Sequence, residues 1–393
     1  MTTKRRSEEV TWWLVGVLVL AVLVSGVGLL IRQILVVPDR SAPTPPQPSA
    51  ASPTVTPTAS GQPLINPADP RVVRPGGRPL LPGSGPDQVF VQSSTAIYRI
   101  ELATGQIIRT PTPLLDQHSS FVAGPGWVVF KTIDNDPGVV VRNGHRAAPL
   151  PPALRPNGRL YPAQSGGMWL VPENPTRGAR VVTRVNVNNG PDRNETIRLS
   201  GEIGLPSADA AHYLFATNSG GTYQFRPSGV RKLTTGDLLA VGRHHLLVWD
   251  CDKKARCNPY RLDRTHGRRT TIPAARKAIL KLYQGNVAQA EGSGGGDLSP
   301  DGTHTALRYP GNRLSSWPIA VVDLSTGQTR TLPGNLTDTN PNSQFAWTAN
   351  GRYFLAITDH QMRAYDTTTG TTRTIPVGTD PLLHLTSTQA SGN

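Results

Sequence analysis

The sequence predicts an all-β protein, a seven-bladed β-propeller preceded by one transmembrane helix and a Pro-rich disordered linker. Three observations support this. Gly and Pro are abundant, 39 and 37 of 393 residues, which suits many short strands joined by turns. Hydrophobic residues make up 37%, too many for a wholly disordered chain. A pattern of strands and turns also recurs along the chain. Together these features exclude a coiled coil and a helical bundle.

The N-terminal region contains the first element, a candidate membrane anchor. Residues 12–31 form a run without a charged side chain, long enough to cross a bilayer as a helix. The run is longer than the apolar core of a cleaved signal peptide, which stays the alternative. Lys4, Arg5 and Arg6 precede it, so we expect residues 1–11 to be a cytoplasmic stub and the rest of the chain to be extracytoplasmic.

The second element is a linker at residues 32–87. It is rich in Pro, Ser and Thr and has little to bury, so we expect an extended spacer biased toward polyproline II. Such a spacer would hold the remaining domain, residues 88–393, away from the cell membrane.

The third element, residues 88–393, carries the repeat. Segments 96–111, 319–333 and 362–376 each contain an alternating strand, a Thr-Gly turn and a second strand ending in proline. Segments 296–309 and 344–359 each place a polar turn with glycine between apolar runs. Four such strands make a propeller blade, and weaker copies fill the preceding residues. We count seven blades, with six or eight left open.

Two segments depart from the regular pattern. The first blade lacks its innermost strand, and residues 381–387 form a leftover strand at the C-terminus. We predict that this strand completes the first blade and closes the ring, which removes open sheet edges. Residues 275–296 exceed a normal connection between blades. We expect a helical turn followed by a Gly-rich loop, and this insertion is the best candidate for a role beyond scaffold.

The clearest repeat motifs are the turns Ser299-Pro300-Asp301-Gly302, Thr348-Ala349-Asn350-Gly351, Asp323-Leu324-Ser325-Thr326-Gly327 and Asp366-Thr367-Thr368-Thr369-Gly370. In these motifs the chain resembles the WD40-like propellers of bacterial exported proteins, the group related to the TolB propeller. The resemblance implies that the first kind of turn joins the two inner strands of a blade and the second kind joins the two outer strands. The resemblance implies a fold and, at most, a binding role, and it implies no catalysed reaction.

The two cysteines, Cys251 and Cys257, are close in sequence. An extracytoplasmic location is oxidising, so we predict a disulfide between them, with free thiols or a metal site as the alternatives. In the blade assignment Cys251 ends one strand and Cys257 begins the next. The bridge would therefore link the two strands of one hairpin.

No motif in the sequence predicts a catalytic, cofactor-binding or metal-binding site. The nine histidines show no ligand spacing, and adjacent His244 and His245 would point to opposite faces of a strand. Ser84 and Ser293 do not fit a nucleophile elbow. The acidic stretch 134–136 suits either a turn or calcium, and a turn is the simpler interpretation. We therefore expect no catalytic, cofactor or metal residues.

The formal net charge is +14, from 40 Lys and Arg against 26 Asp and Glu. Because the basic domain is expected outside the membrane, nucleic acid is not an expected partner. Anionic lipid, wall polymer or an acidic protein would be attracted instead. We therefore predict a membrane-tethered, non-enzymatic platform that binds a protein or a wall ligand. The alternative is an extracytoplasmic hydrolase or lyase with its site at the mouth of the propeller channel.

Overall fold

The structure, a computed structural model, describes residues 68–85, 87–113, 119–132, 138–163, 167–174, 176, 179–188, 190–200, 207–208, 214–218, 221–226, 228–252, 256–285, 296–311, 317–336 and 344–388. All of them belong to the second of two compact units, Ile65–Asn393. Among these residues, no helix has the length and apolar character needed to cross a membrane. The predicted stub, the predicted span at residues 12–31 and most of the predicted linker lie outside the described residues.

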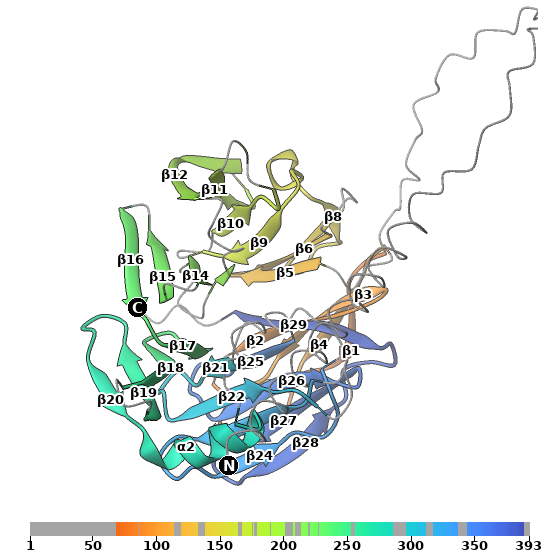
Figure 1. Ribbon diagram of the computed structural model, residues 1–393. Coiled ribbons are helices and arrows are strands. Elements are labelled where there is room, and N and C mark those ends of the chain that lie inside the picture. The colour runs from red at the N-terminus through yellow and green to blue at the C-terminus, as the bar shows by residue number, and fades with distance from the viewer. Residues whose placement is uncertain are drawn as a thin grey trace, which may run out of the picture. The chain divides into compact units, whose positions relative to one another are not determined.

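The described unit is built almost wholly from antiparallel sheets (Figure 1). The first sheet contains five strands in the order β1-β4-β3-β2-β29. Its strands are β1 (Arg71–Arg74), β2 (Gln88–Ser93), β3 (Ala96–Glu101), β4 (Ile107–Pro111) and β29 (Leu382–Thr388). The sheet therefore combines the beginning and the end of the folded unit.

Four further sheets have four strands each. Two follow the first sheet in the chain: β5 (Ser119–Gly124), β6 (Trp127–Thr132), β7 (Val139–Arg142) and β8 (Ala148–Pro149), then β9 (Arg159–Pro162), β10 (Met168–Val171), β11 (Ala179–Asn186) and β12 (Gly190–Ser200), with the 3₁₀ helix η1 (Pro152–Leu154) between them. The others are β13 (Ser207–Ala208), β14 (Leu214–Asn218), β15 (Gly221–Arg226) and β16 (Gly229–Thr234), and β25 (Phe345–Trp347), β26 (Tyr353–Thr358), β27 (Gln361–Asp366) and β28 (Thr371–Ile375).

The remaining sheet has eight strands. One half is β17 (Asp237–Val241), β18 (His245–Cys251), β19 (Cys257–Asp263) and β20 (Arg269–Thr271), and the other is β21 (Gly296–Leu298), β22 (His304–Arg308), β23 (Ile319–Asp323) and β24 (Thr329–Thr331). The halves join because β17 and β21 pair in parallel, Ala240 opposite Gly296 and Val241 opposite Asp297. The helix α2 (Pro273–Leu282) connects the halves in the chain.

The blade count therefore differs from the predicted seven. Five sheets are discrete blades of four or five strands, and the other eight strands form one continuous sheet. The sequence shows where each turn lies, but it does not show whether the innermost strands of two neighbours hydrogen-bond to one another. That pairing is decided by the local spacing of the sheets.

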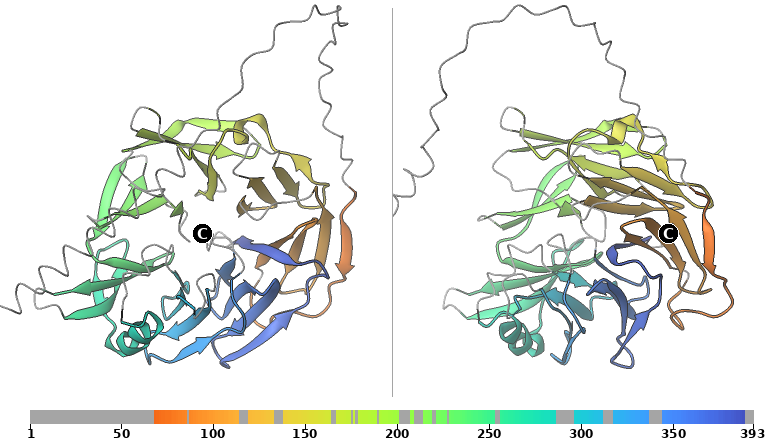
Figure 2. Two further views of the ribbon diagram at one scale, coloured as in Figure 1. Left: turned by 45° about the vertical axis from the view of Figure 1, so that its right-hand side comes forward. Right: turned by 90° about the vertical axis from the view of Figure 1, so that its right-hand side faces the viewer.

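The predicted ring closure is confirmed. Strand β29 pairs antiparallel with β2, from Gln88 opposite Thr388 to Ser93 opposite Leu382. The C-terminal segment thus supplies the innermost strand that the first sheet lacks. Figure 2 shows the sheets arranged around a common centre, with the first and last parts of the unit side by side.

The hydrophobic core lies between neighbouring sheets. In one cluster Val89 and Ile100 of the first sheet pack with Leu355 of β26. In the next, Phe90 of the first sheet packs with Phe130 of β6. Similar clusters join the other neighbours, so burial of apolar surface holds the sheets around the ring.

The turns predicted from the family resemblance are confirmed. The Ser299–Gly302 turn joins β21 to β22, and the Asp323–Gly327 turn joins β23 to β24. In the latter the Gly327 amide donates to the Asp323 carbonyl at 2.8 Å, and Gly327 has a φ of +75°. Glycine adopts this left-handed conformation without the steric cost that other residues carry.

The packed unit begins before residue 88, the expected start of the propeller domain. Strand β1 pairs with β4, with Arg71 opposite Arg109 and Val72 opposite Ile108. Leu80 and Leu81 are buried in the core cluster that joins the first sheet to β26 and β27. Part of the residues assigned to the linker therefore belongs to the folded unit. Its high proline content concealed this, because proline suits an edge strand as well as a linker.

Candidate functional site

The predicted disulfide is confirmed and lies in one hairpin. Cys251 and Cys257 are bonded, and they are directly opposite one another at the ends of β18 and β19. The bridge closes a loop of six residue steps. It therefore fixes the end of a hairpin whose outer neighbour is β20.

The helix α2 confirms the predicted helical turn at the start of the long insertion. Its apolar residues Ala275, Ala278 and Ile279 are buried in a cluster with residues from both halves of the eight-stranded sheet. Pro273 occupies the first turn, where its missing amide costs nothing, and Lys281 lies in the last turn, where a cation complements the helix dipole. The second half of the insertion, residues 286–295, lies outside the described residues.

The exposed side of this region carries positive charge only. Residues 264–285 contain no Asp or Glu. Five of their basic side chains are exposed, and we call this set the basic rim: Arg268, Arg269, Arg276, Lys277 and Lys281. Two carboxylates from outside the segment lie beside it: Asp250 pairs with Arg269 at 3.4 Å, and Asp263 lies 3.3 Å from the His266 Nδ1. Five cations outnumber these two carboxylates, so the basic rim keeps a net positive charge.

Several contacts hold the basic rim to the sheet. The Arg276 Nε donates to the Cys257 carbonyl at 2.8 Å, which connects the helix to the disulfide hairpin. The buried Tyr283 hydroxyl donates to the Arg308 carbonyl at 2.8 Å. A Cβ at Gly327 would lie 2.2 Å from the Ala274 carbonyl oxygen, so the turn after β23 fits closely against the helix. The backbone beneath the cations is thus fixed.

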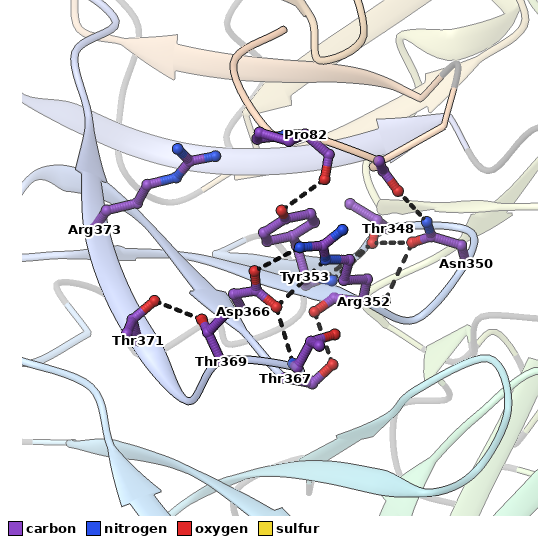
Figure 3. A network of polar contacts seen from close by, with 12 residues as sticks. Pro82, Thr348, Asn350, Arg352, Tyr353, Asp366, Thr367, Thr369, Thr371 and Arg373 are labelled. Carbon is purple, nitrogen blue, oxygen red and sulfur yellow. Dashed lines mark hydrogen bonds and ion pairs between the residues drawn. The ribbon is translucent and has the colours of Figure 1, made fainter.

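A second polar cluster lies where the folded chain begins. We call residues 80–87 the N-terminal clasp, because they are attached to the turn and strand at residues 349–353. The Tyr353 hydroxyl donates to the Pro82 carbonyl at 2.8 Å, and the Asn350 Nδ2 donates to the Gly83 carbonyl at 2.5 Å (Figure 3). The Ala349 amide donates to the Asp87 carboxylate at 2.7 Å. The clasp therefore connects the entry of the chain to the last sheet.

The clasp is supported by an ion pair behind Tyr353. The Arg352 Nη2 lies 3.1 Å from the Asp366 Oδ2, and the Arg352 guanidinium lies over the Tyr353 ring (Figure 3). Partial burial alone would raise the pKa of Asp366, but hydrogen bonds from Arg352 and from the Thr368 amide outweigh it and lower the pKa. These contacts hold the Asp366 carboxylate in place, so the cluster anchors the clasp to the last sheet.

The inner part of the ring contains a buried lysine that the sequence did not indicate. Lys131 is buried, and its Nζ donates to the Gly158 carbonyl at 2.7 Å and to the Thr132 carbonyl at 3.3 Å. Burial lowers the pKa of Lys131, and the nearby Glu173 opposes that shift. Glu173 itself accepts from the Arg159 Nε at 2.7 Å. The lysine satisfies two carbonyl groups between neighbouring sheets.

The other sequence candidates are dispersed. The acidic stretch 134–136, His118 and His212 lie outside the described residues. His245 begins β18, and burial lowers its pKa. His304 and His384 lie on different sheets, in β22 and β29. Within the described ranges no group of three or more His, Cys, Asp or Glu side chains is placed to hold a metal ion.

No family model matches the chain, and no curated protein matches it. Solved structures do match at low identity. TolB from Acinetobacter baumannii is 13% identical, with 78% of this chain and 83% of that chain covered and a TM-score of 0.39. Apo AztD from Citrobacter koseri is 12% identical, with 75% and 82% covered and a TM-score of 0.42. An oligogalacturonate lyase in complex with manganese is 11% identical, with 66% and 78% covered and a TM-score of 0.44.

These likenesses are too weak to carry an argument about function. The propeller-like assignment rests on the strand order, the closure by β29 and the clusters between sheets.

Proposed function

We propose that the protein is a membrane-tethered, extracytoplasmic binding platform whose basic rim holds an anionic polymer of the cell wall. The observation that carries the proposal is the basic rim itself, five exposed cations in a segment with no acidic residue. Such a surface attracts a ligand that repeats negative charge along its length. The contacts around α2 hold the backbone beneath the cations, so little backbone freedom is lost on binding.

The composition of the rim favours a polymer over a folded protein partner. Protein interfaces have an apolar core, and none of the large apolar side chains that are exposed in the described part of the chain lies in residues 264–285. It also favours a polymer over a lipid surface. A helix that lies in a membrane surface inserts apolar side chains, but in α2 Ala275, Ala278 and Ile279 are buried against the sheet, and Leu280 and Leu282 are partly buried there.

The location outside the membrane comes from the sequence alone. The uncharged run at residues 12–31 and the preceding basic residues supply the tether, and the Pro-rich residues after it supply the spacer. A platform of this kind needs no reaction, only a fixed surface held at a distance from the bilayer.

The test is binding of full-length protein, in detergent, to an immobilised glycerol-phosphate polymer. We expect salt-sensitive binding that falls about tenfold or more in R268E/K277E/K281E. The matched control is R71E/R74E/R78E, which changes the net charge equally on another surface and should keep most of the binding. Equal losses in both variants would show attraction by net charge alone and would contradict a site on the rim.

The hydrolase or lyase alternative is tested on the same preparation. A panel of glycans and esters would be turned over by an enzyme, and turnover would contradict a non-enzymatic platform. Loss of that turnover in a variant at the inner strands, with the basic rim intact, would then move the functional site to the centre of the ring.

A further inference from the structure

The outermost strand of the first sheet, β1, has no partner strand on its outer side among the described residues. It pairs with β4 on one side and is last in the strand order of the described sheet. Pro70 and Pro75 flank it directly, so a ladder on its outer edge is limited to a few residues. The unpaired N–H and C=O groups of such an edge can pair with another extended chain.

The same strand carries exposed apolar side chains. Val72 is 56% exposed and Val73 is 48% exposed. They are two of the four large hydrophobic residues that are exposed in the described part of the chain, and they are adjacent. An added strand would cover them, because cross-strand neighbours pack against one another.

The charge around β1 is positive. Arg71, Arg74 and Arg78 lie in residues 70–86, which contain no acidic residue. The preceding carboxylate, Asp69, is engaged by Arg146, whose Nη2 donates to it at 2.7 Å. Asp69 also interacts electrostatically with Arg71, but it is the single carboxylate in residues 69–86, so positive charge predominates around β1.

This charge pattern selects against a second copy of the chain. The sequence of β1 is Arg-Val-Val-Arg, which is the same in both directions. In an antiparallel pair of two β1 strands, Arg71 of each copy would lie opposite Arg74 of the other. Because Arg71 already lies opposite Arg109 in the β1–β4 ladder, such a pair would add further like charge at an edge that is already basic. A strand with acidic residues three apart would place a carboxylate opposite each arginine.

We propose that β1 is a docking edge for a short, acidic, extended peptide segment of a partner protein, which adds to the first sheet by β-augmentation. Main-chain hydrogen bonds supply part of the affinity. Ion pairs between two carboxylates of the peptide and Arg71 and Arg74 set the choice of partner and its register. The inference does not depend on the proposed function, since the basic rim belongs to a different sheet.

The test uses full-length protein and a labelled peptide, Thr-Glu-Val-Val-Glu-Thr, followed by fluorescence anisotropy. We expect weak, saturable, salt-sensitive binding that falls about tenfold in R71E/R74E. The rim variant R268E/K277E changes the net charge by the same amount as R71E/R74E, so it is the matched control and should bind as the unaltered chain does. Circular dichroism melts of both variants check that the substitutions, one of which replaces the partly buried Arg74, leave the fold intact.

Two control peptides separate a ladder from simple charge attraction. The same peptide with N-methylated amides keeps its charges but cannot donate main-chain hydrogen bonds, so its binding should be lost. The Lys-Val-Val-Lys version should also fail to bind. Equal binding of the N-methylated peptide, equal loss in the rim variant, or no binding at all would overturn the proposal. Dimerisation of the chain that V72K/V73K abolishes would overturn it as well, because β1 would then pair with a second copy.

Discussion

Substitution of Leu81 by Ala tests whether the N-terminal clasp is part of the folded ring. Leu81 has no exposed surface and packs in the core cluster that contains Val89, Tyr353 and Leu355. Removing a fully buried leucine side chain loses its transfer free energy and leaves a cavity, at a cost of about 2–5 kcal/mol. We expect the free energy of unfolding to fall by that amount, although residue 81 falls in the predicted linker.

The assay is urea denaturation of the full-length chain, with tryptophan fluorescence to report the folded fraction. Val72→Ala is the control, since Val72 is 56% exposed and its truncation should cost less than about 0.5 kcal/mol. Tyr353→Phe should give an intermediate loss of about 1 kcal/mol, because it removes the hydroxyl that donates to the Pro82 carbonyl. If Leu81→Ala changed the free energy of unfolding no more than Val72→Ala does, the clasp would not be part of the core.

Four further variants test other contacts. Replacing Cys251 and Cys257 by Ser should lower the free energy of unfolding by about 2 kcal/mol, as expected for a short closed loop, and denaturation with and without reductant measures it. Gly370→Ala should cost about 1–2 kcal/mol for the left-handed backbone alone; Gly327→Ala should cost more in the same assay, because its Cβ would also meet the Ala274 carbonyl. The amide of His266 donates to Asp263 and is the main cause that lowers the pKa of this carboxyl from 3.8 to about 2. Because the folded-state pKa is the lower one, the stabilisation by Asp263 is present above about pH 4 and is lost as the pH falls toward 2. Thermal melts of Asp263→Asn should show less acid sensitivity over that interval, and an unchanged pH profile would contradict the assignment.

Much of the ring could be predicted from the sequence because turn chemistry is local. The Thr-Gly turns fixed the ends of the outer strands, and the leftover segment at residues 381–387 indicated the closing strand. One further turn of the same kind, Asp263–Gly267, was matched only as a weaker copy, because His266 stands where the clear copies have threonine. Its Gly267 amide donates to the Asp263 carbonyl at 2.9 Å, as in the clear copies.

The parts that could not be predicted depend on contacts between segments far apart in sequence. The clasp places Pro82 against Tyr353, a separation of 271 residues, and nothing in a Pro-rich segment indicates such a partner. The parallel pairing of Ala240 with Gly296 likewise depends on how two inner strands approach. The insertion singled out from the sequence, residues 275–296, includes the rim cations of α2 but not Arg268 and Arg269. Their common surface forms only when the apolar face of α2 is buried against the sheet.

Hydrogen–deuterium exchange of the full-length protein, with and without a glycerol-phosphate polymer, tests the central claim most directly. Exchange reports which backbone amides become protected when the ligand covers them. We predict that added protection is confined to residues 265–285, in β20 and α2, and that it disappears in R268E/K277E/K281E. Protection at the inner strands around Lys131, with none on the basic rim, would show that the polymer does not bind at the rim.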